Sequence, residues 1–259
     1  MEENFIFQRM LLKTLQNDQI ASILYTSGSS GKPKGVCLTH NNIVQTIKNI
    51  SEFVTYSSES HEVIVLPLSH SFGLNHILCN LNAGGSVSIE DGLVRLKTVF
   101  KMIKKNATGF PGSPSIFGII LTRYCDYFKE IAKNLKFIVV NSAPLPPEMS
   151  KKIMKILPNT KLYVYYGLTE ASRSTFILHN LKNKTLLRSV GKATPNTSIA
   201  VLDENQEIKH NSANGEVLIK GKNVMHGYWN ENNNNKVMIK NWFKTGDLGY
   251  INKSGYLFL

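Results

Sequence analysis

A glycine-rich turn between two short apolar segments constrains the fold more than any other feature of the sequence. Residues 25–36 read YTSGSSGKPKGV, and the apolar segments 20–25 and 35–38 flank the turn. Its glycines permit positive φ and a close approach of the backbone to a ligand, so successive N–H groups can point at one anion. Its hydroxyls and lysines add hydrogen-bond donors and positive charge. The sequence therefore predicts two strands joined by a loop that wraps a polyphosphate. The groups expected to bind it are Thr26, Ser27, Gly28, Ser29, Ser30, Gly31, Lys32 and Lys34.

Two unrelated motifs share letters with this turn. A Walker phosphate loop needs a Ser or Thr after its lysine and then a helix, whereas Lys32 is followed by Pro33 and a predicted strand. A serine acylase needs S-x-x-K on a helix, with K-T-G and S-D-N elements elsewhere. Residues 29–32 and 244–246 match the first two elements. The glycine and proline of the turn disfavour a helix there, and the S-D-N element is missing.

The spacing of apolar residues predicts an α/β fold. Strand-like segments alternate with helical patterns, which implies crossover connections and parallel pairing. The strands are expected at 62–67, 85–89, 135–140 and 160–165, and the helices at 42–53, capped by Thr39 or Asn41, 93–105 and 147–157. From about residue 186 short strands are separated by Gly, Asn and Asp. We therefore expect a layered, largely parallel sheet with flanking helices over residues 1–185, followed by a smaller antiparallel β subdomain over 186–259.

The formal net charge of +12 invites a nucleic-acid-binding interpretation. However, the basic residues are spread along amphipathic helical segments, and only five of the thirty are Arg. This distribution favours solvated helix faces, because nucleic-acid modules usually concentrate Arg and aromatic residues. No nucleic-acid partner is expected.

The cysteines and the apolar stretches bear on location. Cys37, Cys79 and Cys125 lie far apart in apolar segments, which is typical of buried thiols. No signal-peptide pattern opens the sequence, and no stretch approaches the ~18 apolar residues that cross a bilayer. We expect a cytoplasmic protein without a transmembrane segment.

Five further motifs follow the glycine-rich turn. They are PLSHSFGL at 67–74, NSAPL at 141–145, YYGLTE at 165–170, GEV at 215–217 with GYW at 227–229, and WFKTGDLG at 242–249. In this order the six motifs resemble the signatures of the adenylate-forming superfamily, which includes acyl-CoA synthetases, aryl-CoA ligases, peptide-synthetase adenylation domains and luciferases. The resemblance covers residues 20–259. One departure is that Asn141 and Ser142 stand where glycines are common in the family.

The resemblance implies a role for particular residues. Glu170 would hold Mg²⁺ together with Thr26, Thr169 would contact the α-phosphate, and Asp247 would accept both ribose hydroxyls. The nucleotide would also be bound by Ser142, Ala143, Pro144, Tyr165, Tyr166 and Gly167, with Tyr166 against adenine. Independently of the family, Glu170 follows a strand and a glycine turn, at the edge where open α/β sheets bind ligands. A carboxylate oxygen is also a ligand that Mg²⁺ prefers.

Three other residues have competing interpretations. His70 would border the acyl pocket by resemblance and is counted with Thr169 and Glu170 as catalytic, whereas periodicity alone favours a core or capping histidine. For His76, in the helix that follows, we expect the structural role. Arg173 either contacts an anionic substrate group or pairs with a surface carboxylate, and both interpretations stay open.

The implied chemistry has two steps. A fatty or aryl carboxylic acid attacks ATP to form an acyl-adenylate, and a thiol then attacks the acyl group. The resemblance implies ATP or AMP, Mg²⁺, and CoA or a carrier-protein phosphopantetheine as the thiol. The family's preceding N-terminal region, G-R-x-D hinge and C-terminal lid domain are missing from these residues, so we expect a truncated, poorly active fragment that forms a homo-oligomer or needs a complementing chain. Three function classes stay open: a ligase, a non-catalytic nucleotide- or acyl-binding relic, and a basic nucleic-acid-binding protein.

Overall fold

The glycine-rich turn joins two antiparallel strands, as the sequence predicts. The structure, a computed structural model, describes residues 18–26, 32–230 and 237–259. Strands β1 (Ile20–Thr26) and β2 (Lys34–Thr39) pair antiparallel, with Thr26 opposite Lys34 at the end of the hairpin next to the turn. Strand β13 (Gly227–Tyr228) pairs with the other side of β2 and places Tyr228 opposite Val36. The predicted phosphate-binding residues 27–31 lie outside the described part of the chain.

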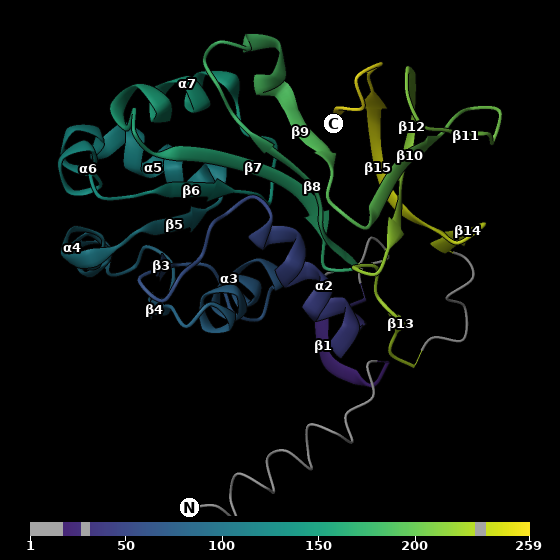
Figure 1. The fold of residues 1–259 in the computed structure, drawn as a ribbon, viewed down its shortest axis with the longest axis horizontal. Coiled ribbons are helices and arrows are strands. Elements are labelled where there is room, and N and C mark those ends of the chain that lie inside the picture. Colours follow the sequence, from purple (N-terminus) through teal and green to yellow (C-terminus); the bar gives the residue numbers. More distant parts are fainter. Residues whose placement is uncertain (1–17, 27–31, 231–236) are drawn as a thin grey trace, which may run out of the picture.

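A parallel sheet forms the centre of the α/β part (Figure 1). Its order is β4 (Ser86–Ile89), β3 (His61–Ile64), β5 (Gly109–Gly112), β6 (Phe137–Val140) and β7 (Lys161–Leu168), and all these neighbours are parallel. Helices α4 (Leu96–Asn106), α5 (Pro114–Arg123), α6 (Cys125–Ile131) and α7 (Pro147–Ile156) cover one face, and α2 (His40–Ser51) and α3 (Ser71–Asn82) cover the other.

The two faces follow from the alternation of side chains along each strand. In β6, Ile138 and Val140 join the core under α4–α7, whereas Phe137 and Val139 join the core under α2 and α3. Both faces are therefore buried, which explains the nearly continuous apolar runs of these strands. Thr39 is the N-cap of α2, because Thr39 and Asn42 exchange side-chain and backbone hydrogen bonds in a capping box.

Antiparallel strands continue the sheet beyond β7. The order is β8 (Ala171–Leu178), β9 (Ser189–Ala193), β16 (Leu257–Phe258), β15 (Trp242–Ile251), β12 (Ala213–Gly221), β10 (Thr197–Leu202) and β11 (Ile208–Lys209). Strand β14 (Met238–Ile239) pairs with β15, and a 3₁₀ turn, η1 (Lys184–Arg188), precedes β9. The predicted fold class is confirmed. Strand β8 lies within the predicted parallel core, but it pairs antiparallel because only Thr169 and Glu170 separate it from β7. The division near residue 186 stays a prediction.

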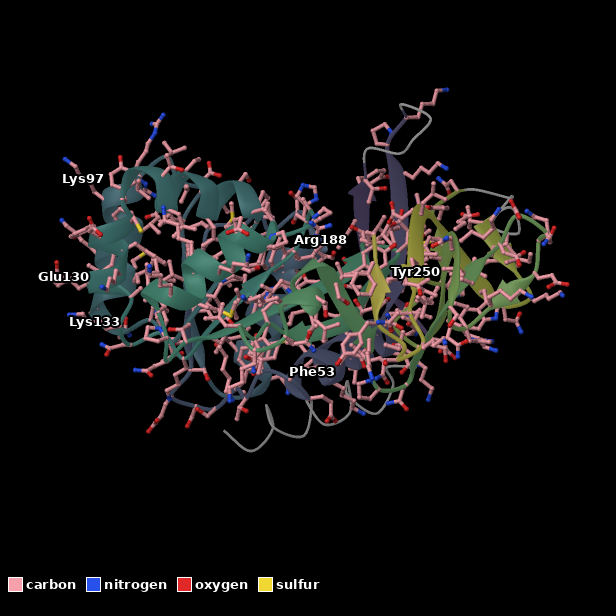
Figure 2. The ribbon with its side chains drawn as sticks, turned by 90° about the horizontal axis from the view of Figure 1, so that it is seen from above. Phe53, Lys97, Glu130, Lys133, Arg188 and Tyr250 are labelled. Carbon is pink, nitrogen blue, oxygen red and sulfur yellow. The ribbon has the colours of Figure 1, made fainter. Side chains whose placement is uncertain are left out.

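The charged side chains at the surface and the cysteines can be compared with the sequence analysis. Lys97 and Lys133 point outward at the end of the molecule farthest from the late β strands, with Glu130 near them (Figure 2). Cys37 and Cys79 are buried as expected, whereas Cys125 is partly exposed. In the described ranges, no helix is both long and apolar enough to span a membrane.

Candidate functional site

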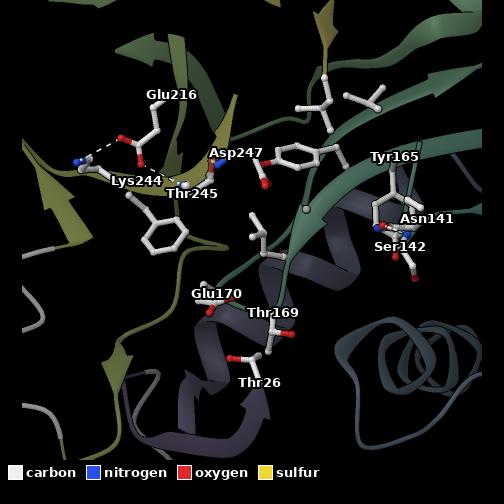
Figure 3. Close-up of a pocket in the computed structure, with 18 of the residues that line it drawn as sticks. Thr26, Asn141, Ser142, Tyr165, Thr169, Glu170, Glu216, Lys244, Thr245 and Asp247 are labelled. Atoms are coloured by element: carbon white, nitrogen blue, oxygen red, sulfur yellow. Dashed lines mark hydrogen bonds and ion pairs between the residues drawn. The ribbon is translucent and has the colours of Figure 1, made fainter. Parts of the chain in front are cut away.

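A pocket of about 990 Å³ collects residues from all six motifs (Figure 3). It lies where the β7–β8 turn meets the hairpin and β15. The predicted site residues that line it are Thr26, Lys34, His70, Ser142, Ala143, Pro144, Tyr165, Tyr166, Gly167, Thr169, Glu170 and Asp247. Lys32 is exposed and does not belong to the described lining. The roles of all these residues stay predictions, but their convergence is a property of the fold.

One end of the pocket gathers hydroxyl, ammonium and carboxylate groups. Thr26, Thr169 and Glu170 lie near one another there (Figure 3). Glu170 is 8% exposed, and its Oε1 accepts a hydrogen bond from the Tyr228 hydroxyl at 2.9 Å. The Glu170 carbonyl accepts a second bond from the Met225 N–H at 2.7 Å. The turn is therefore held by both its side chain and its backbone.

The lysine of the hairpin belongs to the same arrangement. Lys34 Nζ lies 5.0 Å from the centre of the Tyr228 ring, a distance at which a cation is attracted to an aromatic face. Tyr228 thus contacts both Lys34 and Glu170, two opposite charges on different elements. This end of the pocket offers what a polyphosphate with a bound cation requires.

The donor set also restricts the kind of metal ion. Within the described ranges, no group of three or more His, Cys, Asp or Glu side chains converges to hold a metal. A cation beside Glu170 would therefore take few protein ligands and complete its shell with phosphate oxygens and water. Mg²⁺ binds in this way, through one or two carboxylates plus substrate phosphates.

The other end of the pocket centres on Asp247, which follows a turn in β15. The Tyr166 hydroxyl donates to Asp247 Oδ2 at 2.7 Å. Burial raises the pKa of Tyr166 above its usual value, so this hydroxyl stays protonated and remains a donor at neutral pH. Glu216 of β12 holds the turn from the next strand: its Oε1 accepts from the Gly246 N–H at 3.0 Å, and its Oε2 pairs with Lys244 Nζ at 3.3 Å. Gly246 has a φ of 78°, which explains a glycine at this position.

The backbone of the loop after β6 explains why the adenylate-forming family often has glycine where this chain has Ser142. Ser142 has a φ of 81°. This left-handed backbone conformation is energetically unfavourable for any residue that has a Cβ atom. The Ser142 N–H donates to the side-chain oxygen of the neighbouring Asn141. Tyr165 lies beside Asn141 and Ser142 (Figure 3) and packs with Phe72 and Phe176 in the core under α2 and α3. Tyr165 and Tyr166 thus point to opposite faces of β7.

The structure resolves the competing interpretations of three residues. His70 is exposed at the pocket wall, so the core interpretation is wrong; it occupies the N-cap position of α3, but its side chain makes no capping hydrogen bond. His76 is a core residue, as expected, and its Nδ1 lies 2.9 Å from Glu62 Oε2. Arg173 is 1% exposed, so its pairing with a surface carboxylate is also wrong.

Sequence reasoning did not select several polar residues of the pocket. Tyr228, Glu216, Lys244 and Thr245 line it beside the predicted groups. Each lies within a motif that the sequence analysis quotes. Their side chains act across strand pairs, β13 with β2 and β12 with β15. The motifs therefore include these residues, but only the pairing of the strands shows which of their side chains face the pocket.

Comparisons with known proteins agree with this geometry. The family model described as "AMP-binding enzyme" matches residues 4–229. The chain is 35% identical to an oxalate–CoA ligase from Arabidopsis thaliana, over 93% of this chain and 48% of that protein. It is 31% identical to a long-chain-fatty-acid–CoA ligase from Bacillus subtilis, over 93% of this chain and 43% of that protein.

A solved structure shows the same fold. It is a double mutant of o-succinylbenzoate CoA synthetase from Bacillus subtilis bound with a product analogue, and it superimposes with a TM-score of 0.82 at 25% identity. The match covers 94% of this chain and 49% of that one, so the chain spans about half the length of the relatives it matches. By the family model and by its fold, the chain belongs to the AMP-binding enzymes of the adenylate-forming superfamily.

Proposed function

We propose that these residues form the nucleotide-binding part of a ligase that activates a carboxylic acid with ATP and transfers it to a thiol. The observation that carries the proposal is the convergence of Thr26, Thr169 and Glu170 at one end of a single pocket and Asp247 at the other. These four residues come from three separate motifs, and they line one pocket. The sequence predicts a fatty or aryl acid as the carboxylic acid substrate, and CoA or a carrier-protein phosphopantetheine as the thiol.

The residues at the two ends of the pocket would bind different parts of the nucleotide. Lys34, Thr26 and Thr169 would contact phosphate oxygens, and Asp247 would accept the ribose hydroxyls while Tyr166 fixes the orientation of its carboxylate. Glu170 with Thr26 would hold Mg²⁺, which when bound neutralises charge on the polyphosphate. A carboxylate oxygen of the acid attacks the α-phosphorus, the bond to the bridging oxygen breaks, and pyrophosphate leaves. Positioning and electrostatics carry such a step, so no protein nucleophile is required.

The setting of the reaction follows from the same proposal. The chain spans about half the length of the relatives, so turnover of the whole ligase is proposed for an assembled or longer protein. These residues alone would bind nucleotide and turn over poorly, with a second copy or a complementing chain as the partner. A cytoplasmic location is part of the proposal.

Calorimetric titration with Mg²⁺–ATP tests this function directly. We expect binding by the unmodified chain and a loss of about tenfold or more in affinity for Asp247→Ala, because a charge-assisted hydrogen bond contributes about 1.5–3 kcal/mol. Asp91→Ala is the matched control, since Asp91 is exposed and lies outside the pocket lining. The proposal fails if folded protein shows no nucleotide binding, or if both variants bind equally well.

Tyr228→Phe tests how the metal end is positioned. The variant removes the hydroxyl that donates to Glu170 and leaves the ring beside Lys34. Because such outer partners of metal ligands contribute about 10–100-fold to metal affinity, we expect the Mg²⁺ concentration that half-saturates ATP binding to rise by about tenfold. Metal-free AMP binding should not change. Tyr250→Phe, at an exposed tyrosine outside this pocket, is the control. An unchanged Mg²⁺ requirement in Tyr228→Phe would contradict this role.

A further inference from the structure

Arg173 is the largest fully buried side chain of the described residues, and it lies directly behind a wall of the pocket. Its guanidinium carbon is 4.5 Å from the centre of the Tyr165 ring and 5.5 Å from that of Phe72. Tyr165 lines the pocket beside Asn141, and His70 lines it immediately before α3. The phosphate and ribose ends are formed by other residues. The sequence analysis expects His70 at the acyl pocket and Tyr165 at the nucleotide, so the region between these two residues is where the acyl group would adjoin the nucleotide.

The Arg173 guanidinium connects the two elements that form this wall of the pocket. Its Nη1 donates to the Ser172 hydroxyl at 2.9 Å and to the Ser71 carbonyl at 3.4 Å, and its Nη2 donates to the Phe72 carbonyl at 3.1 Å. Ser71 and Phe72 begin α3, so Arg173 joins β8 to the first turn of that helix. This holds Phe72 and Tyr165 at right angles, with 5.5 Å between their ring centres.

The position of Arg173 is energetically unfavourable in several ways, which indicates a specific role. Among the described residues, no carboxylate lies within ion-pairing distance of Arg173, and Nε has no hydrogen-bond partner. The cation also lies beside the positive end of a helix dipole. In addition, Arg173 has a φ of 55°, a strained backbone conformation for a residue with a Cβ. A buried charge without a paired carboxylate is expensive, and strained residues of this kind concentrate at ligand sites.

Among the described residues, the side chains behind this wall are closely packed. Phe72, Tyr165 and Phe176 belong to one buried core, in which Phe53 stacks on Phe176 with ring centres 4.4 Å apart. A long acyl chain that entered past His70 would have to displace Arg173 or both rings.

Resting on the proposed function, we propose that Arg173, with Phe72 and Tyr165, closes the acyl end of the pocket, so that the ligase takes a short-chain carboxylic acid. Arg173 is then a specificity-determining residue that acts by holding the wall, without contact with the reacting atoms. The proposal narrows the fatty or aryl range that the sequence predicts.

Acyl-sulfamoyl adenosines test this inference by calorimetry on the unmodified chain. In these probes a sulfamate replaces the phosphate of the acyl-adenylate, and the acyl group is acetyl, butanoyl, octanoyl or palmitoyl. We expect the acetyl and butanoyl probes to bind at least about tenfold more tightly than the octanoyl and palmitoyl probes, because overpacking a closed pocket opposes binding. Equal or tighter binding of the long probes would overturn the inference while leaving the proposed function intact. If neither Mg²⁺–ATP nor any probe binds to folded protein, the proposed function fails, and the inference fails with it.

Two variants separate size from charge. Arg173→Ala opens space behind the wall and should reduce the preference for short probes to within about threefold. Arg173→Met fills much of the same space without the charge, so it should keep the preference. If Arg173→Ala does not fold, the probe series on the unmodified chain still decides the question. A folded Arg173→Ala that keeps the full preference would show that Arg173 does not set acyl length.

Discussion

Replacing Glu170 by Gln should weaken the binding of Mg²⁺–ATP by about a hundredfold or more. Glu170 is a buried carboxylate held by Tyr228, and a neutral amide of the same shape removes the negative charge that a divalent cation requires. A lost charge-assisted interaction of about 3 kcal/mol corresponds to a factor of more than one hundred. Titration with ATP at several Mg²⁺ concentrations measures the effect, and metal-free AMP should bind both forms with similar affinity.

The control for this variant is Glu204→Gln, at an exposed glutamate in the turn after β10. It makes the same change of charge away from the pocket, so it should bind Mg²⁺–ATP like the unmodified chain. If Glu170→Gln binds Mg²⁺–ATP as tightly as this control, Glu170 is not the metal ligand. If it loses metal-free AMP to the same extent, the variant has disturbed the whole turn.

Gly167→Ala should cost about 3 kcal/mol of unfolding free energy and also remove nucleotide binding. A Cβ at position 167 would lie 2.6 Å from the backbone nitrogen of Arg173 and 2.7 Å from the carbonyl oxygen of Ala171. Both are backbone atoms of β8, so the β7–β8 pairing must shift to accommodate the methyl group. That pairing carries Thr169 and Glu170 in its turn. Chemical denaturation measures the first effect, and titration with Mg²⁺–ATP measures the second.

Gly118→Ala provides the matched substitution. Gly118 lies inside α5, and the nearest atom to a Cβ there is the terminal methyl of Met149 at 3.8 Å. Alanine has the higher helix propensity, so this variant should be unchanged or more stable by up to about 1 kcal/mol. If Gly167→Ala is as stable as Gly118→Ala, the close approach of the two strands is not what requires glycine at position 167.

The strands and helices with regular apolar spacing could be predicted because burial imposes that spacing. The segments around β3, β4, β6 and β7 and around α2, α4 and α7 were all expected. Strand β5 (Gly109–Gly112) was not, because GFPG has no alternation and contains residues that usually interrupt strands. It is a strand because it pairs in parallel with β3 on one side and β6 on the other, in a sheet where all four of its residues are buried.

The candidate site shows the same division. Thr169, Glu170 and Asp247 were expected because their motifs resemble those of the family. Tyr228 and Glu216 were not, because each acts through a distant segment: Tyr228 donates to Glu170 in the β7–β8 turn, and Glu216 accepts from Gly246 on the paired strand β15. Arg173 is the sharpest case, since its sequence neighbourhood indicated a surface or substrate contact, and packing placed it between two aromatic rings.

The sequence by itself determined the α/β class, the hairpin, and the set of polar residues fit for a nucleotide, because turn chemistry and apolar spacing are local properties of the chain. The tertiary structure alone decided which partners hold those residues and how Arg173 packs behind the pocket. Both depend on contacts between residues about a hundred positions apart, such as Arg173 with Phe72, which no local pattern encodes.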